Sequence, residues 1–173
     1  MSTEAAEVIN TVNIYPIALD TLSWDLFDLA FTDDVHADFG GAAVWNDLAS
    51  LKEAFAFIHA PFESTQHVTT NHQVVVDGDR ATCLSYVRGI FIRTVPEGGS
   101  MFDSGGWYDD QLVKTAKGWR IRHRVCRMQW WTGNPAVLET MPEVKVEHVL
   151  NTLRGEAAAG TIAHIRNLQQ RLR

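Results

Sequence analysis

The spacing of apolar residues changes near Pro61, and that change restricts the possible fold more than any other feature. Before Pro61 the apolar side chains recur at helical intervals, as in Leu48, Leu51 and Phe55. After it, segments rich in valine and threonine alternate as strands do, and Asp77-Gly78 is a hairpin turn signal. This segregated order predicts an α+β fold with a mostly antiparallel sheet. Helices are expected at 16–31 and 47–60, and strands at 35–39, 67–76, 80–94, 107–115 and 119–131.

Pro16 interrupts the first helical region, because a helix that ran straight through it would lose a hydrogen bond. A new helix is therefore expected to begin at Pro16. In that helix Asp20 shares a face with Trp24 and Phe27, which places a carboxylate among aromatic rings. There it needs a partner or a wet cavity. The alternative is a frayed first turn, where its charge suits the helix dipole.

The last predicted strand carries charged residues on both of its faces. Alternation predicts that His123 and Arg127 point inward, although an inward arginine needs a carboxylate partner or a wet cavity. Two alternatives remain open: the strand ends before Arg127, or a β-bulge resets the alternation. The other inward residues would be Trp119, Ile121 and Val125, and the outward residues Arg120, Arg122 and Arg124.

Motifs for metal, nucleotide or nucleophile chemistry are absent from the sequence. His67 and His72 would lie on opposite faces of an unbroken strand, so they are not expected to share a metal ion. Cys83 and Cys126 lie inside predicted strands, which favours a packing role. No glycine-rich phosphate loop or nucleophile elbow is present. We therefore expect no metal and no cofactor.

Charge and hydropathy argue against two classes of partner. The 173 residues include 15 basic and 21 acidic side chains, a net charge of −6, without the basic cluster that binds nucleic acid. No apolar run approaches the roughly 18 residues of a membrane helix. The acidic N-terminal residues do not resemble a signal peptide, and two cysteines suit a reduced chain, so we expect a cytoplasmic protein.

Three separate blocks of sequence resemble the SnoaL-like domains of the nuclear transport factor 2-like superfamily. The blocks are YPIALDTLSWDLFDLAFTDDVHADF, STQHVTTNHQVVVDGDRA and GWYDDQLVKTAKGWRIRHRV. The resemblance covers roughly residues 8–135 and implies a cone, in which a strongly curved sheet wraps around N-terminal helices. We therefore predict a SnoaL-like domain at 1–140 and a C-terminal helical extension at 141–173. We also expect a homo-oligomer, with a dimer as the first choice.

The resemblance also implies a site. In the branch that includes scytalone dehydratase, bile-acid dehydratase and hexachlorocyclohexane dehydrochlorinase, an Asp near the first helix pairs with a His that begins a strand. The matching residues are Asp20 and His67, while Tyr15 matches a Tyr five residues before that Asp and Arg127 falls near a late Arg. An imidazole oriented by a carboxylate is a suitable general base. These four residues are the predicted catalytic residues.

The function expected from this pattern is proton abstraction from carbon by a small-molecule lyase or isomerase that resembles a dehydratase. The many aromatic residues favour an apolar, cyclic substrate. A binding or dimerisation domain without activity, and a polyketide-cyclase-like enzyme, remain alternatives because this fold hosts many functions. The predicted substrate-binding residues are Trp24, Phe39, Phe55, Tyr86 and His123.

Overall fold

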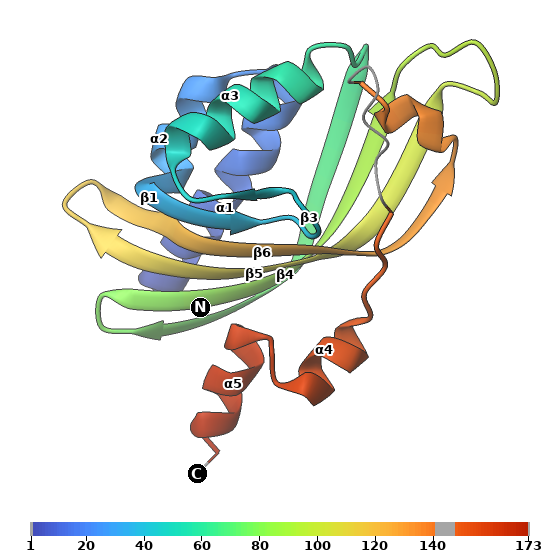
Figure 1. The fold of residues 1–173 in the computed structure, drawn as a ribbon. Coiled ribbons are helices and arrows are strands. Elements are labelled where there is room, and N and C mark those ends of the chain that lie inside the picture. The colour runs from blue at the N-terminus through green and yellow to red at the C-terminus, as the bar shows by residue number, and fades with distance from the viewer. Residues whose placement is uncertain (1, 141–147, 173) are drawn as a thin grey trace.

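A curved sheet and the helices that it encloses form the body of the protein (Figure 1). The computed structural model describes residues 2–140 and 148–172. In chain order the elements are α1 (Thr3–Thr21), a 3-10 helix (Trp24–Leu26), α2 (Phe27–Ala30), β1 (Phe31–Asp38), β2 (Val44–Trp45), α3 (Leu48–His59), β3 (Ser64–Asp77), β4 (Arg80–Ile92), β5 (Met101–Thr115), β6 (Gly118–Gly133), a second 3-10 helix (Pro135–Leu138), α4 (Leu153–Ala159) and α5 (Ala163–Gln170).

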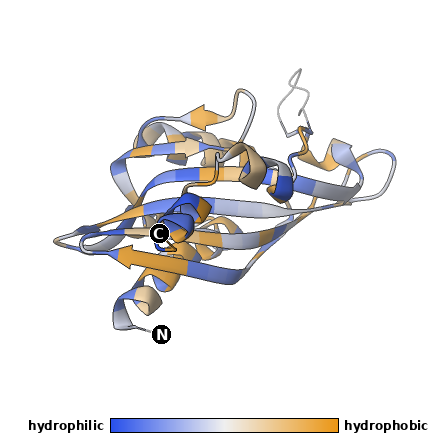
Figure 2. Ribbon diagram, turned by 90° about the horizontal axis from the view of Figure 1, so that it is seen from below, coloured by the Kyte–Doolittle hydropathy of each residue, from blue (hydrophilic) through white to orange (hydrophobic). Residues whose placement is uncertain are grey.

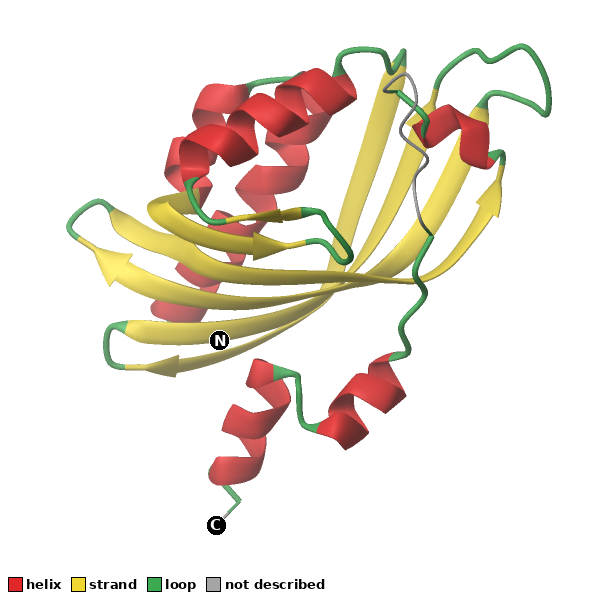
Figure 3. Cartoon of the chain, viewed as in Figure 1, coloured by secondary structure: helices red, strands yellow, loops and turns green. Residues whose placement is uncertain are grey.

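The described strands form one sheet in the order β2-β1-β6-β5-β4-β3. The β1–β6 pair is parallel and the other neighbouring pairs are antiparallel. Helices α1–α3 lie on the concave face, and α4 and α5 lie on the opposite, convex face (Figure 3). The predicted α+β class and curved, mostly antiparallel sheet are therefore confirmed. No helix in the described segments is both long enough and apolar enough to cross a bilayer.

The break predicted at Pro16 is wrong, because α1 continues through it to Thr21. Ser2 caps the N-terminus of α1, and its hydroxyl accepts a hydrogen bond from the N–H of Ala5. One face of α1 is buried from Val8 to Leu19, so packing outweighs the backbone hydrogen bond that Pro16 cannot donate. Leu22 caps the C-terminus of α1 in the left-handed conformation, with φ 53°. Asp20 therefore belongs to the last turn of α1.

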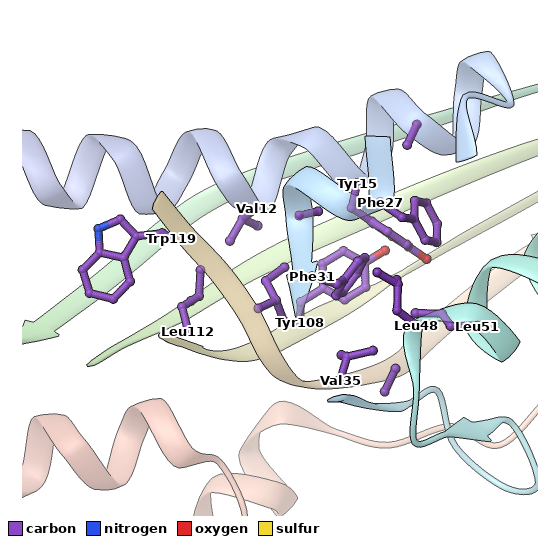
Figure 4. Packing of buried hydrophobic residues seen from close by; sticks show 14 of the residues in the cluster. Val12, Tyr15, Phe27, Phe31, Val35, Leu48, Leu51, Tyr108, Leu112 and Trp119 are labelled. Atoms are coloured by element: carbon purple, nitrogen blue, oxygen red, sulfur yellow. The ribbon is translucent and has the colours of Figure 1, made fainter. Parts of the chain in front are cut away.

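The core fills the space between α1–α3 and the concave face of the sheet (Figure 4). Aromatic rings make up much of it, and Tyr15 contacts five of them edge-on or tilted, with centroids 5.4–6.4 Å apart. Completely or almost completely buried members include Val12, Tyr15, Phe27, Phe31, Val35, Leu112 and Trp119.

A bulge in β6 decides which of its side chains face the core. Ile121 pairs with Leu112 and His123 pairs with Gln111, so Arg122 is an extra residue that resets the alternation. The inward and outward positions predicted for this strand are therefore wrong after Arg122. The β-bulge that was named as an alternative is present.

The reset exchanges the expected positions of the arginines. Arg124 points inward and is completely buried, while His123 and Arg127 lie on the convex face. His123 stacks on the ring of His36 with centroids 4.8 Å apart. Arg127 forms an ion pair with Asp38, in which Nη2 and Oδ2 are 2.7 Å apart.

A second irregularity lies in β3, at Asn71, whose φ is 55°. Thr70 pairs with Tyr86 and the next pair is Gln73 with Leu84, so two residues of β3 face one of β4. His67 and His72 consequently share the concave face, and the prediction of opposite faces is wrong because it assumed an unbroken strand. Among residues 2–140 and 148–172, no group of three or more His, Cys, Asp or Glu side chains could hold a metal ion.

β5 begins at Met101 rather than at residue 107, because Gly105 and Gly106 belong to the strand. A Cβ atom at Gly106 would clash with the carbonyl group of Arg127, and one at Gly105 would clash with the ring of Trp130. The two glycines thus allow β6 to approach the β5 backbone closely, next to another irregularity in the register.

The C-terminal extension packs on the convex face of the sheet, where α5 contacts β3, β4 and β5 (Figure 2). It contains two short helices where one was expected. The carboxylate of Asp109 accepts hydrogen bonds from the first N–H groups of α5, those of Ala163 at 2.6 Å and His164 at 3.1 Å. The predicted domain boundary after residue 140 adjoins residues 141–147, which lie outside the described residues.

Replacing Asp109 with alanine should detach the start of α5 from the sheet. Two buried N–H groups would lose their acceptor, at a cost of about 1–2 kcal/mol by analogy with helix N-caps. Amide hydrogen exchange at Ala163 and His164 measures the effect and should become several-fold faster. Asp79→Ala, at an exposed turn, is the matched control. Unchanged protection of both amides in Asp109→Ala would show that the carboxylate does not hold α5.

Candidate active site

Asp20 and His67 form a hydrogen-bonded pair between the last turn of α1 and the start of β3. His67 Nδ1 lies 2.8 Å from Asp20 Oδ1, and the backbone N–H of His67 donates to Oδ2 at 2.8 Å. The hydroxyl of Thr65 also donates to Oδ1 at 2.8 Å. Three donors therefore fix the carboxylate, and the carboxylate fixes the orientation of the imidazole.

These hydrogen bonds set the charge of the pair. Partial burial alone would raise the pKa of Asp20, but the hydrogen bonds from the ring and backbone N–H groups of His67 outweigh it and lower the pKa. Asp20 is therefore an anion at neutral pH. An anionic acceptor at Nδ1 keeps the proton on that nitrogen, so Nε2 of His67 has a free lone pair.

The Nε2 edge of His67 lies over a glycine. Nε2 and Cδ2 would each be 3.3 Å from a Cβ atom at Gly89, so a larger residue there would press on the ring. Phe91 stands edge-on to the same ring at 5.2 Å, and the ring of His59 lies 6.4 Å away. Among the described residues, Nε2 has no hydrogen-bond partner. This edge of the imidazole is the one available for proton transfer.

Two tyrosines lie in the core beside this pair. Tyr15, one of the predicted catalytic residues, and Tyr108 meet edge-to-face at 5.9 Å. Figure 4 shows both hydroxyl groups directed toward the same end of the core, away from Trp119. Burial raises the pKa of both well above the usual value, and the charge of Asp20 contributes to the increase at Tyr108. Both phenols are therefore neutral hydrogen-bond donors.

A buried ion pair lies against the two tyrosine rings. Arg124 donates to Asp110 through Nε and Nη2, both at 2.7 Å, and both side chains are completely buried. The guanidinium lies 4.2 Å from the ring centroid of Tyr108 and 4.5 Å from that of Tyr15. Its third nitrogen, Nη1, is buried without a partner among the described residues. Arg124 thus occupies the inward position that the sequence assigned to Arg127.

The predicted substrate-binding residues divide into two groups. Phe39 and Phe55 lie 5.1 Å apart beside Tyr15, and Trp24 stands edge-on to His59 at 5.8 Å, so these three gather on the concave side. Tyr86 is 46% exposed and pairs with Thr70 and Trp107 on the convex face. With His123 and Arg127 also convex, three predicted site residues lie on the wrong face of the sheet.

His59 is the main residue that the sequence analysis missed. It is 5% exposed, stacks on Phe55 at 5.4 Å and donates from Nδ1 to the carbonyl of Phe55, 2.9 Å away. A signal was available, because His59 continues the apolar face of Leu48, Leu51 and Phe55 in the helix. Burial lowers the pKa of His59 to about 4, so it is uncharged at neutral pH.

The low pKa of His59 makes stability depend on pH. Between the ordinary value near 6.5 and the folded value of about 4, the unfolded chain binds a proton that the folded protein does not. Stability therefore falls as pH falls through this window, by about 3 kcal/mol at pH 4. Urea unfolding at pH 7 and pH 4 gives the free energy of unfolding of the wild type and of His59→Phe. The wild type should lose about 3 kcal/mol more than His59→Phe between the two pH values. A difference between the two proteins that does not change with pH would contradict it.

The geometry defines a class of protein: a cone-shaped α+β fold with an Asp–His pair between its first helix and its sheet. The family model of the SnoaL-like domain matches residues 1–125, and the chain belongs to this family. The predicted family is thus confirmed.

Similar proteins agree with this assignment. The uncharacterized protein Rv2910c of Mycobacterium tuberculosis (strain ATCC 25618 / H37Rv) is 30% identical over 112 residues, which are 64% of this chain and 76% of the relative. The crystal structure of Kfla4162 from Kribbella flavida has a TM-score of 0.72 and 28% identity, covering 75% of this chain and 93% of that chain. A type 2 hexachlorocyclohexane dehydrochlorinase (LinA) has a TM-score of 0.66 and 15% identity, covering 80% and 94%. That last likeness establishes the fold alone.

Proposed function

We propose that this protein is a lyase or isomerase that removes a proton from a carbon atom of a small, apolar, ring-bearing substrate. The observation that carries the proposal is the 2.8 Å hydrogen bond between His67 Nδ1 and Asp20 Oδ1, with the opposite edge of the imidazole over Gly89. His67 is the general base, and Asp20 stabilises the imidazolium that forms when Nε2 takes the proton.

The electron pair of the broken C–H bond then has two possible destinations. In an elimination it forms a carbon–carbon double bond, while the leaving group departs with its own bonding pair. In an isomerisation it delocalises onto an adjacent carbonyl oxygen, and the proton returns at another carbon. Tyr15 and Tyr108, as neutral phenols, donate hydrogen bonds to the developing negative charge. Arg124, against both rings, adds a positive charge nearby.

The structural likeness to a dehydrochlorinase supports an elimination, since that relative's name describes the loss of hydrogen chloride. The aromatic side chains of Trp24, Phe39 and Phe55 support an apolar ring as the substrate. The competing function is a binding domain in which Asp20 and His67 only tie α1 to β3.

Deuterium exchange tests for a carbon acid–base catalyst without the natural substrate. The probes are 2-tetralone, 1-indanone and cyclohexanone in D₂O, with the loss of the proton signals next to the carbonyl followed by NMR. We expect the wild type to accelerate exchange of at least one probe over buffer, and Asp20→Asn to slow it. Arg127→Met, on the convex face, is the control and should retain the wild-type rate. No acceleration with any of the three ketones would favour the binding domain.

Oligomeric state and cellular location remain predictions. A second copy of the chain has exposed apolar side chains on the convex face to pack against, among them Val68, Tyr86 and Trp130. Light scattering at micromolar concentration measures the mass, and a monomer would contradict the expected dimer. A cytoplasmic location is tested by fractionation of cells that express the protein.

A further inference from the structure

The proposed base has a second imidazole beside it, and the two rings differ in their partners. His67 donates from Nδ1 to the carboxylate of Asp20, whereas His59 donates from Nδ1 to the backbone carbonyl of Phe55. The ring centroids lie 6.4 Å apart. A carboxylate stabilises a positive imidazolium, but a neutral carbonyl does so far less. His67 is thus arranged to gain a proton and His59 to remain neutral.

The hydrogen bond to Phe55 also defines what His59 offers a ligand. With the proton held on Nδ1, Nε2 is an acceptor and has no hydrogen to donate. No described residue donates a hydrogen bond to this atom. Stacking on Phe55 and edge contacts with Trp24 and Phe62 hold the ring in place. The surroundings are therefore aromatic, with one fixed acceptor.

A fixed acceptor in apolar surroundings discriminates between substrates. A ligand hydroxyl satisfies it, whereas a halogen or an ether oxygen has no hydrogen to donate and leaves it desolvated and unpaired. The ring centroids are 6.4 Å apart, so a ring-bearing ligand with its acidic C–H at His67 would extend toward His59 with its hydroxyl group.

We propose that Nε2 of His59 accepts a hydrogen bond from a hydroxyl group of the substrate, so the substrates are hydroxylated ring compounds and not halogenated hydrocarbons. This inference rests on the proposed function, because it assigns His59 as the specificity-determining neighbour of the base. In an elimination, the electron pair of the C–H bond forms the double bond and the oxygen leaves with its own bonding pair, taking from the His67 imidazolium the proton that makes it water. In an isomerisation the hydroxyl stays as an anchor.

The test compares 2-naphthol with 2-methoxynaphthalene, which has a similar ring but no donor. NMR titration of protein labelled with ¹⁵N in its histidines gives the dissociation constants of both probes. The same spectra report on His59, whose signal is identified because it is missing from the spectrum of His59→Phe. We expect 2-naphthol to bind the wild type about three- to tenfold more tightly, the range of one net hydrogen bond. The Nε2 signal of His59 should move with 2-naphthol alone.

Two variants separate the acceptor from the ring. His59→Phe keeps the stacking on Phe55 but removes the nitrogen, and should bind both probes equally. His59→Gln places an amide oxygen near the position of Nε2 and should keep part of the preference. Equal binding of both probes by the wild type, a preference that survives in His59→Phe, or binding of neither probe would each overturn the inference. The proposed function fails separately, when the wild type does not accelerate deuterium exchange of the ketone probes.

Discussion

Proton removal from carbon by the His67→Ala variant should be about 10²- to 10⁴-fold slower than by the wild type, the usual contribution of a positioned general base. The melting temperature should change little, because Asp20 keeps its hydrogen bonds from the backbone N–H of His67 and from Thr65. Deuterium exchange of the ketone probe that the wild type turns over measures the rate, and circular dichroism measures the melting.

His67→Gln separates catalysis from structure. Its amide N–H can still donate to Asp20, but glutamine is no base, so this variant should fold normally and be as slow as His67→Ala. If His67→Ala unfolds while a folded His67→Gln exchanges at the full rate, the residue only ties α1 to β3. The proposed function would then be wrong.

Replacing Arg124 with methionine should destabilise the protein by about 3–5 kcal/mol, because it leaves the completely buried carboxylate of Asp110 without its partner. In a protein of this size that corresponds to a fall in melting temperature of roughly 6–20 °C. Urea unfolding followed by tryptophan fluorescence gives the free energy, and calorimetry the melting temperature.

The matched control is on the same strand. Arg127→Met removes the partly exposed ion pair with Asp38 and should cost no more than about 1 kcal/mol. The double variant Asp110→Leu/Arg124→Met removes both buried charges together and should recover most of the lost stability. If the double variant is no more stable than Arg124→Met, the packing of the guanidinium between Tyr15 and Tyr108, and not the unpaired carboxylate, explains the loss.

The fold class could be predicted from the sequence because apolar spacing reports on local structure. The change of period near Pro61 separated α3 from the long strands β3–β6. The interruption of α1 was predicted wrongly, since the propensity rule for Pro16 ignores the packing of the buried helix face. The hydrogen bond between Asp20 and His67 was also expected, although Asp20 reaches His67 from the end of α1 and not from a helix that continues to Trp24.

The remaining site residues depended on register, which residue spacing does not reveal. Strict alternation assigned Arg127 and His123 to the concave face, and the bulge at Arg122 moved Arg124 there instead. Tyr86 was predicted to bind the substrate. The alternation of side chains along β4 places it on the convex face instead. His59 was the exception, because its helical spacing could have identified it.

The extra residue in β6 affects how this chain compares with its relatives. Arg122 is itself a solvent-facing side chain, so substituting it should change little. Deleting it would remove the bulge: His123 would follow Ile121 in plain alternation, and Arg124 would keep its inward position opposite Asp110 while standing one position nearer to Ile121 in the chain. A relative that lacks this extra residue has no bulge here. An arginine three residues after the equivalent of Ile121 would then face outward in the relative, whereas Arg124 faces inward in this chain. Alignments should therefore place their gap at Arg122 before any arginine is assigned a shared role.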